Sequence, residues 1–200
     1  MDEYVRNNYV LLRGRPRGEA LWSHAARSQD FYTLPLEVRR LSGASDTLNV
    51  TLRASMLPLL DGASRIEAEG ELRSFNSRRG EWPRLVITVF ARSILLAGEE
   101  ADENLVELRG TLCKAPKARR TPMGRDICDL LLAVNRSYGR SDYLPCICWG
   151  LTARECSSWT VGTKLALRGR IQSRSYLKLT EEGTLERVAF EVSASEVERL

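Results

Sequence analysis

The feature that most constrains the fold of this chain is a sequence that occurs twice. NNYVLLRG at residues 7–14 reappears as ENLVELRG at residues 103–110, an offset of 96 positions. The same offset relates three further pairs: Val38 and Val134, Arg40 and Arg136, and Asp46 and Asp142. It then grows to 99 and finally to 103, as short loop insertions would require. In a chain of 200 residues, such a repeat predicts two similar domains of a common size.

Within each copy, apolar and polar residues alternate with the period of a half-buried strand. Five such segments occur in the first copy, at about 8–14, 31–39, 47–53, 64–74 and 84–94. Matching segments recur in the second copy, about a hundred residues later. Between the third and fourth lies one short stretch that fits about two helical turns. We therefore expect an all-β chain of two tandem OB-folds, five-stranded Greek-key barrels each with one short helix after the third strand. A single β-sandwich is the alternative, which the repeat disfavours.

The joint between the copies is the acidic stretch GEEADE at residues 98–103, which has no apolar residue to bury apart from one alanine. This places the first domain at residues 1–98 and the second at residues 104–200. The chain carries 30 Lys plus Arg and 26 Asp plus Glu, a net charge of +4 that permits an anionic partner. No apolar run approaches the ~20 residues that span a bilayer, and the start of the chain does not resemble a signal peptide, so we expect a cytoplasmic protein with no membrane contact.

The sequence contains no motif that indicates a catalytic site, a metal site or a cofactor site. The five cysteines are an odd number, which argues against a complete disulfide framework, and their spacing does not pair them as zinc ligands. His24 is the only histidine, and neither a phosphate-binding glycine loop nor a nucleophile elbow occurs. The sequence therefore predicts a protein that is not an enzyme and that holds neither a metal nor a cofactor.

The third predicted strand differs between the copies on its outward face. Once Leu48, Val50 and Leu52 are assigned to the core, the strand period places polar side chains outward in the first copy. The outward positions of the second copy hold instead two aromatic rings and two apolar residues, namely Tyr143, Pro145, Ile147 and Trp149, with Leu144, Cys146 and Cys148 inward. Aromatic rings thus occupy positions that water would normally cover.

The fourth predicted strand shows a matching change in charge. Glu69 and Glu71 of the first copy are replaced by Arg168 and Arg170 in the second. Three further residues continue the same face, Arg174, Tyr176 and Lys178. Exposed rings among cations suit a flexible single strand of nucleic acid, since bases stack on the rings and cations follow the phosphates. The alternative is that a loop or a partner chain covers these rings.

The second copy resembles the bacterial single-stranded-DNA-binding protein family. The resemblance rests on NLVELRG, APKARRTPMGRDICDLLLAVNRS, YLPCICWG and GTKLALRGRIQSRSY, and it spans the second copy nearly end to end. It implies four aromatic positions, which this chain fills with Tyr138, Tyr143, Trp149 and Tyr176. The equivalents in the first copy are Ser42, Thr47, Arg53 and Ser77, so the stacking set is expected to be lost there, with Phe75 nearby as a substitute for one member.

The expected nucleic-acid-binding set also includes a basic loop between the first two strands of the second copy. Its full membership is Tyr138, Tyr143, Trp149, Tyr176, Arg119, Arg120, Arg136, Arg140, Arg168, Arg170, Arg174 and Lys178. The second domain is thus expected to bind nucleic acid, and the first to serve structure or oligomerisation. RNA stays open as a ligand beside DNA.

The resemblance implies sequence-tolerant binding and protection of single-stranded DNA in replication, recombination or repair. Because the family works with four OB-folds per assembly, it also implies a homodimer of this tandem chain. The chain ends SASEVERL without the acidic tip that recruits replication proteins in family members. The alternative function is therefore an interaction module, similar to primosomal OB proteins, whose main partner is another replication protein.

Overall fold

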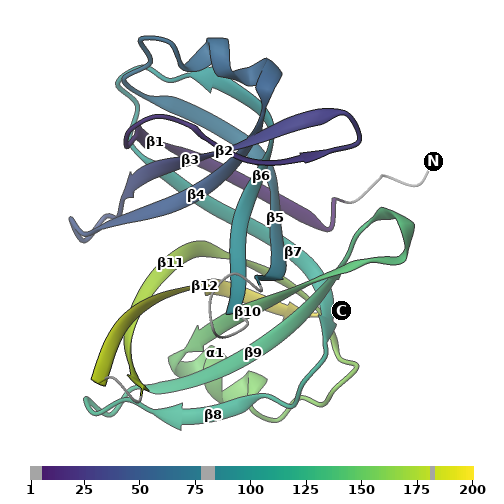
Figure 1. Ribbon diagram of the computed structural model, residues 1–200. Helices are drawn as coiled ribbons and strands as arrows, with labels where there is room; N and C mark the ends of the chain where they lie inside the picture. Colours follow the sequence, from purple (N-terminus) through teal and green to yellow (C-terminus); the bar gives the residue numbers. More distant parts are fainter. Residues whose placement is uncertain (1–5, 78–83, 181–182) are drawn as a thin grey trace.

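The computed structural model describes residues 6–77, 84–180 and 183–200, and in these ranges the chain forms two β-barrels (Figure 1). The first contains β1 (Asn8–Pro16), β2 (Leu21–Ala26), β3 (Gln29–Arg39), β4 (Ser45–Arg53), the 3-10 helix η1 (Ala54–Leu60), β5 (Ile66–Ser77) and β6 (Arg84–Leu96). The second contains β7 (Glu103–Leu112), β8 (Lys117–Arg120), β9 (Asp126–Asn135), η2 (Ser137–Gly139), β10 (Ser141–Trp149), α1 (Gly150–Cys156), β11 (Lys164–Thr180) and β12 (Gly183–Arg199). The prediction of two tandem OB-folds is confirmed.

The strand order is the same when read outward in either direction from the middle of the sheet. It runs β2-β3-β4-β6-β5-β1 in the first barrel and β7-β11-β12-β10-β9-β8 in the second, with β1 against β7 at the centre. Each barrel closes through one more pairing, β1 with β3 and β7 with β9. Closure removes most of the free strand edges, which would otherwise invite pairing with other chains. The two barrels are thus related by a pseudo-two-fold axis.

Two differences separate the barrels from the expected five-strand pattern. Each has one additional short strand, β2 or β8, which forms a hairpin with the strand that follows it. Every residue of β8 is exposed and β2 is nearly as open, so neither shows the alternation that marks a half-buried strand. The expected helix is present in both barrels, but as a 3-10 helix in the first, where Pro58 lies inside it. Among the helices in the described ranges, none is long and apolar enough to cross a membrane.

The core of each barrel consists of the inward residues of its alternating strands. In β4 the buried side chains include Leu48, Val50 and Leu52, and in β10 Leu144, Cys146 and Cys148, as the strand period predicts. At one equivalent position in each barrel, two backbone segments approach so closely that a side chain would not fit between them. A Cβ at Gly70 would lie 2.1 Å from the carbonyl oxygen of Phe90, and one at Gly169 would lie 2.3 Å from that of Ser193. Only glycine fits at these two crossings.

A side-chain contact recurs at the predicted offsets and confirms the repeat. The Asn8 amide donates to the Leu72 carbonyl and accepts from its N–H, both at 2.8 Å. Asn104 binds the backbone of Ile171 in the same two ways, at 2.8 and 2.9 Å. The offsets of 96 and 99 found in the sequence therefore correspond to equivalent places in the two barrels. Each asparagine joins the first strand of its barrel to β5 or β11.

The barrels are joined along β1 and β7, which pair antiparallel. Val10 lies opposite Val106, and since these two residues are themselves 96 apart, the pseudo-two-fold axis passes between them. The hydrogen-bonded ladder extends from Asn8 opposite Leu108 to Arg13 opposite Glu103. The two cores therefore share one continuous sheet instead of meeting through a loop-to-loop contact.

A pair of buried carboxylates extends this junction on both sides of the axis. Asp46 of the first barrel accepts hydrogen bonds from the N–H and the hydroxyl of Ser173 in the second, at 2.8 and 2.6 Å. Arg40 completes the site through a bidentate ion pair with Asp46, at 2.6 and 2.5 Å. We call these contacts, with their equivalents in the other barrel, the inter-barrel clamps.

The second clamp repeats the first with the barrels exchanged. Asp142 of the second barrel accepts a 2.6 Å hydrogen bond from the N–H of Ser74 in the first. Arg136 pairs with both oxygens of Asp142 and also donates to the Ser74 carbonyl at 3.1 Å. Arg73 adds a further hydrogen bond at 3.0 Å. Both aspartates are fully buried, so each clamp satisfies a charge that would be costly to leave unpaired.

The clamps predict how stability depends on pH. Burial alone would raise the pKa of Asp46, but the hydrogen bonds from Arg40 and Ser173 outweigh burial and hold that pKa below its ordinary value. A carboxylate with a lowered pKa stabilises the fold above its unfolded-state pKa, and this contribution is lost as the pH falls through the folded-state pKa.

We expect Asp46→Asn to lower the free energy of unfolding by about 3 kcal/mol at pH 7, because Arg40 and Ser173 lose a buried charged partner. In urea denaturation, the difference from the wild-type chain should shrink as the pH falls below about 4, the ordinary range of an aspartate. Asp129→Asn is the control, since this half-exposed partner of Arg119 should contribute less than about 1 kcal/mol. Equal effects of the two substitutions would contradict the role of the clamp.

Candidate nucleic-acid interface

A groove of about 1230 Å³ runs along the second barrel at its junction with the first. We call it the second-barrel groove. Its lining includes residues of β10, β11 and β12, the β8–β9 hairpin and the tip of the β3–β4 hairpin, which belongs to the first barrel. The charged members are Arg39, Arg40, Arg119, Arg125, Arg168, Arg170, Arg174, Asp102, Glu103 and Glu191. Seven arginines face three carboxylates, so the groove favours an anionic ligand.

Trp149 supplies the aromatic surface of this groove. It is the last residue of β10 and is followed by Gly150, whose φ of 59° turns the chain into α1. The side chain is 37% exposed, and its indole N–H donates a 3.1 Å hydrogen bond to Ser193 Oγ on β12. Since the polar edge of the indole is held by protein, the ring is oriented while part of its surface stays open to a ligand.

Three arginines follow one another along the outward face of β11. Arg168, Arg170 and Arg174 are exposed, and all three line the groove. Arg168 lies 3.7 Å from Glu107, and Arg174 lies 3.7 Å from Glu191. The Arg168–Glu107 pair is long and exposed on both sides and contributes little to stability, so the Arg168 guanidinium group can turn to a phosphate at small cost. Glu191 is buried and also accepts a 2.9 Å hydrogen bond from Gln172.

The predicted basic loop is a β-hairpin in which both named arginines have partners. Arg119 forms a bidentate pair with Asp129 at 2.6 and 3.0 Å, and Arg120 donates to Asp126 at 2.9 Å. Hydrogen bonds from Arg154 and Arg120 hold the pKa of Asp126 below its ordinary value. Arg119 faces the groove, whereas Arg120 is absent from its lining. The hairpin therefore brings one of the two arginines to the candidate site.

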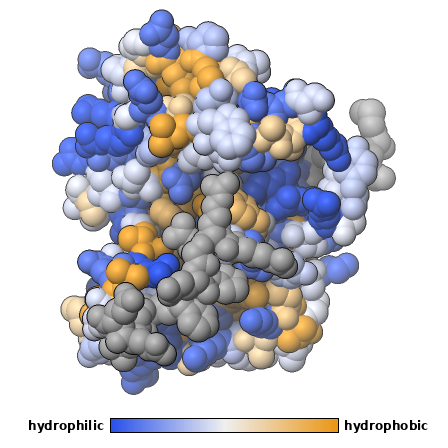
Figure 2. Space-filling model, in the orientation of Figure 1, coloured by the Kyte–Doolittle hydropathy of each residue, from blue (hydrophilic) through white to orange (hydrophobic). Residues whose placement is uncertain are grey.

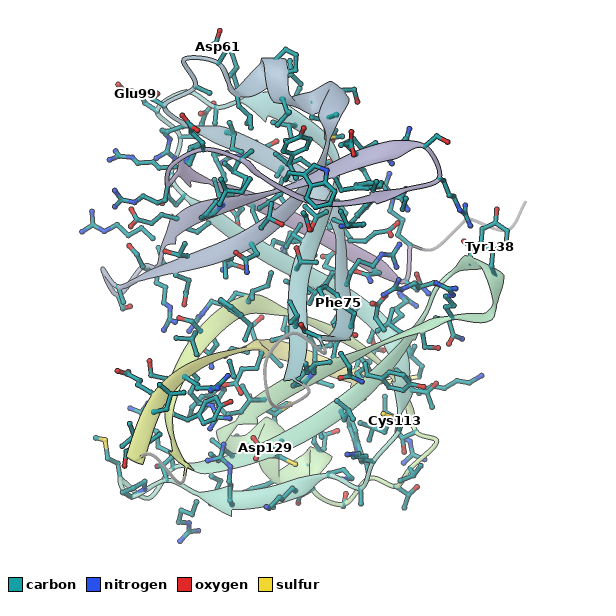
Figure 3. All side chains as sticks on the ribbon, in the orientation of Figure 1. Asp61, Phe75, Glu99, Cys113, Asp129 and Tyr138 are labelled. Carbon is teal, nitrogen blue, oxygen red and sulfur yellow. The ribbon has the colours of Figure 1, made fainter. Side chains whose placement is uncertain are left out.

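The predicted set does not gather on one surface. Tyr143 and Tyr176 are 51% and 39% exposed, but neither lines the second-barrel groove. Tyr138 is 94% exposed at the tip of the β9–β10 hairpin, on the right of Figure 3, far along the hairpin from the Trp149 end of β10. Arg140 of the same hairpin lines a different groove, on the first barrel. The side chain of Lys178 lies outside the described part of the molecule.

Two expectations need correction. Ile147 was expected on the open face of β10, yet it is 2% exposed, because it forms the floor of the groove where β10 pairs with β12. Arg136 was expected to contact nucleic acid, but its guanidinium group is held by the buried Asp142 and by the Ser74 carbonyl. Binding a phosphate would require Arg136 to leave a fully buried carboxylate, so the geometry assigns it to the inter-barrel clamp.

Sequence reasoning missed the contribution of the first barrel to this groove. Arg39, Leu41 and Ser42 lie at the end of the β3–β4 hairpin and line the groove of the other barrel. A position-by-position match between the two copies does not show which residues cross the axis. On the face drawn in Figure 2, hydrophilic residues gather at the left of the upper barrel, on the side of this hairpin in Figure 1.

The cysteines form a buried cluster. Cys128, Cys146, Cys148 and Cys156 are buried, with 3.9 Å between the Sγ atoms of Cys148 and Cys156. Burial, with smaller contributions from Cys156 and Asp129, raises the pKa of Cys128 to about 11, and burial also raises the pKa of Cys146. Within the described ranges, no three His, Cys, Asp or Glu side chains are grouped as metal ligands.

Comparison with known proteins identifies the family of the chain. Residues 103–200 match the Single-strand binding protein family. The Single-stranded DNA-binding protein B of Bacillus subtilis (strain 168) is 38% identical over 80 residues, covering 36% of this chain and 71% of that protein. The chain belongs to the single-strand binding protein family. The Single-stranded DNA-binding protein 2 of Listeria innocua is 34% identical over 80 residues, and the match covers half of that relative.

A similarity in fold covers both barrels. The wild-type single-stranded DNA binding protein from Thermus aquaticus superposes with a TM-score of 0.77 over 96% of this chain and 92% of that structure, at 23% identity. A deletion mutant of the same protein gives a TM-score of 0.76 at 24% identity. The tandem arrangement of two OB-folds is thus shared with a solved structure. The family consists of binding proteins, and the chain is accordingly not an enzyme.

The buried cluster predicts the reactivity of the thiols. Cys113 is the one partly exposed cysteine of the five, and burial raises its pKa as well. In the folded chain at pH 7.5, we expect Ellman's reagent to titrate at most this one thiol, and slowly, because the thiolate is the reacting form. In urea all five should react. Rapid reaction of two or more thiols before unfolding would contradict the burial of the cluster.

Proposed function

We propose that this chain binds single-stranded DNA without strong sequence preference, and that the second-barrel groove is its main contact surface. The observation that carries this proposal is the position of the Trp149 ring in a groove lined by Arg168, Arg170 and Arg174. The family to which the chain belongs, and the printed names of its relatives, support the same ligand.

The residues of the groove favour a single strand over a duplex as the ligand. A base of a single strand can leave its neighbours and stack on Trp149, a contact worth about 1–3 kcal/mol per base in such proteins. The arginines along β11 are spaced to follow successive phosphates, and neutralising them releases counterions. In a duplex, the base faces are already stacked, so the ring would have no partner.

We include the exposed aromatic rings outside the groove in the proposed binding surface. Tyr143 and Tyr176 lie on β10 and β11, the strands that carry Trp149 and the arginines, and both are open to solvent. We assign them to the flanks of the path of the strand. Residues 104–200 then form the principal binding domain, and residues 1–98 the domain that joins and completes it.

The biological setting follows from the ligand. A protein that covers single strands acts where duplex DNA is opened, in replication, recombination or repair, and we place this chain there, in the cytoplasm. The alternative, an interaction module whose main partner is another replication protein, is not supported by the relatives found, whose names describe DNA binding.

The first test is a titration of labelled oligo-dT at low and high salt. We expect Trp149→Ala to weaken binding by about 1–3 kcal/mol, because the base no longer has a ring on which to stack. Replacing Arg168 and Arg170 with alanine should weaken binding and lower the salt dependence by about one counterion for each phosphate that is no longer bound. Trp22→Ala is the matched control, since this exposed tryptophan is absent from the second-barrel groove. Failure of the wild-type chain to bind oligo-dT at low salt would reject the proposal.

The second test concerns assembly. The resemblance to a family that works with four OB-folds supports a homodimer of this two-barrel chain. Light scattering after size exclusion should therefore give a mass close to that of two chains of 22.6 kDa each. A mass of one chain at micromolar concentration would contradict the homodimer and leave DNA binding by the second barrel as a separate question.

A further inference from the structure

Two of the buried cysteines of the second barrel lie within reach of each other. Cys148 belongs to β10 and Cys156 is the last residue of α1, and their Sγ atoms are 3.9 Å apart. A disulfide has a sulfur–sulfur distance of about 2.05 Å, so an approach of roughly 2 Å would join them. Both side chains are fully buried, and a second chain cannot reach either sulfur in the folded barrel. The geometry therefore favours a bond within one chain.

The first copy shows that the core of the barrel does not require a thiol on the strand before the helix. The equivalent of Cys148 is Leu52, and the equivalent of Cys146 is Val50, and both are fully buried as well. All five cysteines of the chain lie in the second copy. A free cysteine packs as a small apolar residue, a role that leucine and valine fill in the first core. The second core thus differs from the first in the chemistry of its sulfurs.

The short helix α1 covers the pair and is held by few contacts. It packs against β9 and β10 (Figure 1), but only Ala153 and Cys156 of its seven residues are buried. An ion pair between Arg154 and Asp126 ties it to β9, and the arginine is 66% exposed. A helix of this length is not stable by itself in water, so opening α1 costs less than unfolding the barrel. Such an opening admits hydrogen peroxide, which is far smaller than Ellman's reagent.

The two sulfurs differ in acidity because they share a hydrogen bond. In the neutral pair, the Cys156 thiol donates to Cys148. Once one proton is lost, a hydrogen bond from Cys148 favours the thiolate of Cys156 and lowers the pKa of Cys156. The same hydrogen bond, together with burial, raises the pKa of Cys148. Since the thiolate is the reacting form, Cys156 is the first of the two to attack an oxidant.

We propose that Cys148 and Cys156 form a reversible redox pair beneath α1, in which a peroxide creates an intramolecular disulfide and a dithiol reductant removes it. Neither reaction involves DNA, so the pair can be tested whether or not the chain binds a single strand. The Cys148 side chain points into the core, whereas Trp149 beside it lines the second-barrel groove. The disulfide therefore forms behind the groove and leaves its lining in place.

The reaction balances with one peroxide for each disulfide. The Cys156 thiolate attacks one oxygen of hydrogen peroxide, the O–O bond breaks, and a sulfenic acid and hydroxide result. The Cys148 sulfur then attacks the sulfenic sulfur, so that the S–S bond forms as the S–O bond breaks. The leaving hydroxide takes the proton of the Cys148 thiol as water. Two thiols have then lost two electrons and two protons, and the peroxide has become two waters. A dithiol reverses the change by two thiol–disulfide exchanges.

The second sulfur limits how far the first is oxidised. A sulfenic acid without a neighbouring thiol can go on to a sulfinic or sulfonic acid, and these are not restored by thiols. Either acid would place a charged group in the apolar core of the barrel, which is costly. Capture of the Cys156 sulfenic acid by Cys148 ends the oxidation at a state that a reductant reverses.

The test is to treat the folded chain with hydrogen peroxide, block the remaining thiols and digest it with trypsin. Cleavage after Arg154 places Cys148 and Cys156 in different peptides. We expect these two peptides to be joined, the intact mass to fall by two hydrogens, and dithiothreitol to separate the peptides again. A link through Cys128, or further oxidation of the pair without a link, would overturn the proposal. So would the absence of a link once the same treatment has oxidised the partly exposed Cys113.

Single substitutions identify the sulfurs that are joined. Cys148→Ala and Cys156→Ala should each abolish the link between the two peptides. Cys146→Ala is the matched control, because Cys146 is buried in the same strand and lies in the same tryptic peptide as Cys148. A link that persists in Cys148→Ala and disappears in Cys146→Ala would assign the bond to the wrong sulfur and overturn the pair.

A further variant keeps all the cysteines and so avoids a change in the core. Asp126→Asn removes the ion pair with Arg154, and because α1 then opens more readily, the link should form roughly two- to fivefold faster. Asp129→Asn is its matched control, since it makes the same change of charge on β9 but releases Arg119 instead of α1. Equal rates for the two variants would overturn the assignment of α1 as the cover of the pair.

Discussion

The antiparallel pairing of β1 with β7 is the constraint on which the rest of the structure depends. It joins two barrels, each with its own core, into one sheet and places a pseudo-two-fold axis between Val10 and Val106. Backbone pairing alone would leave the barrels free to tilt about a narrow ladder. The inter-barrel clamps prevent this tilt, since Asp46 and Asp142 each hold a serine of the other barrel at a distance from the axis. Because both carboxylates are fully buried, each has one arrangement in which its charge is satisfied.

This junction also contributes residues to the proposed binding groove. Arg40 holds Asp46 and at the same time lines the second-barrel groove, and Arg136 has both roles on the other side. The clamps thus lie beside the turns of the β3–β4 and β9–β10 hairpins, which reach across to the neighbouring barrel. A groove of this kind exists only when both barrels are present in the observed arrangement. The proposed binding surface is therefore a property of the pair of barrels, although Trp149 belongs to one of them.

The sequence allowed the repeat, the fold and the inward residues to be predicted, because each follows from local periodicity. The offsets of 96, 99 and 103 correspond to equivalent contacts of Asn8 and Asn104, and the strand period assigned Leu144, Cys146 and Cys148 to the core correctly. These features depend on residues that are neighbours in one strand or equivalent in two copies. No knowledge of how the barrels meet was needed.

The candidate site was predicted less completely, because it depends on contacts across the axis. Arg136 carries the charge expected of a residue that binds nucleic acid. Only its hydrogen bonds to Asp142 and to the Ser74 carbonyl show that it belongs to the clamp. Tyr138 was grouped with Trp149 by sequence, although the hairpin carries it away from that groove. Strands β2 and β8 were missed because an exposed hairpin has no buried face to produce alternation.

The two copies are more alike in their side-chain contacts than at single positions of the sequence. A position-by-position comparison records Arg53 as the loss of a tryptophan, since Trp149 is its equivalent. The ring, however, is on the neighbouring strand, where Phe90 replaces Ser193, and the two residues of each pair are in contact in both barrels. Because the two strands pair side by side at this point, a ring can be contributed from either one and still face the same groove. A ring in contact with a side chain of the neighbouring strand is therefore present in both barrels, although the two copies look dissimilar at each single position.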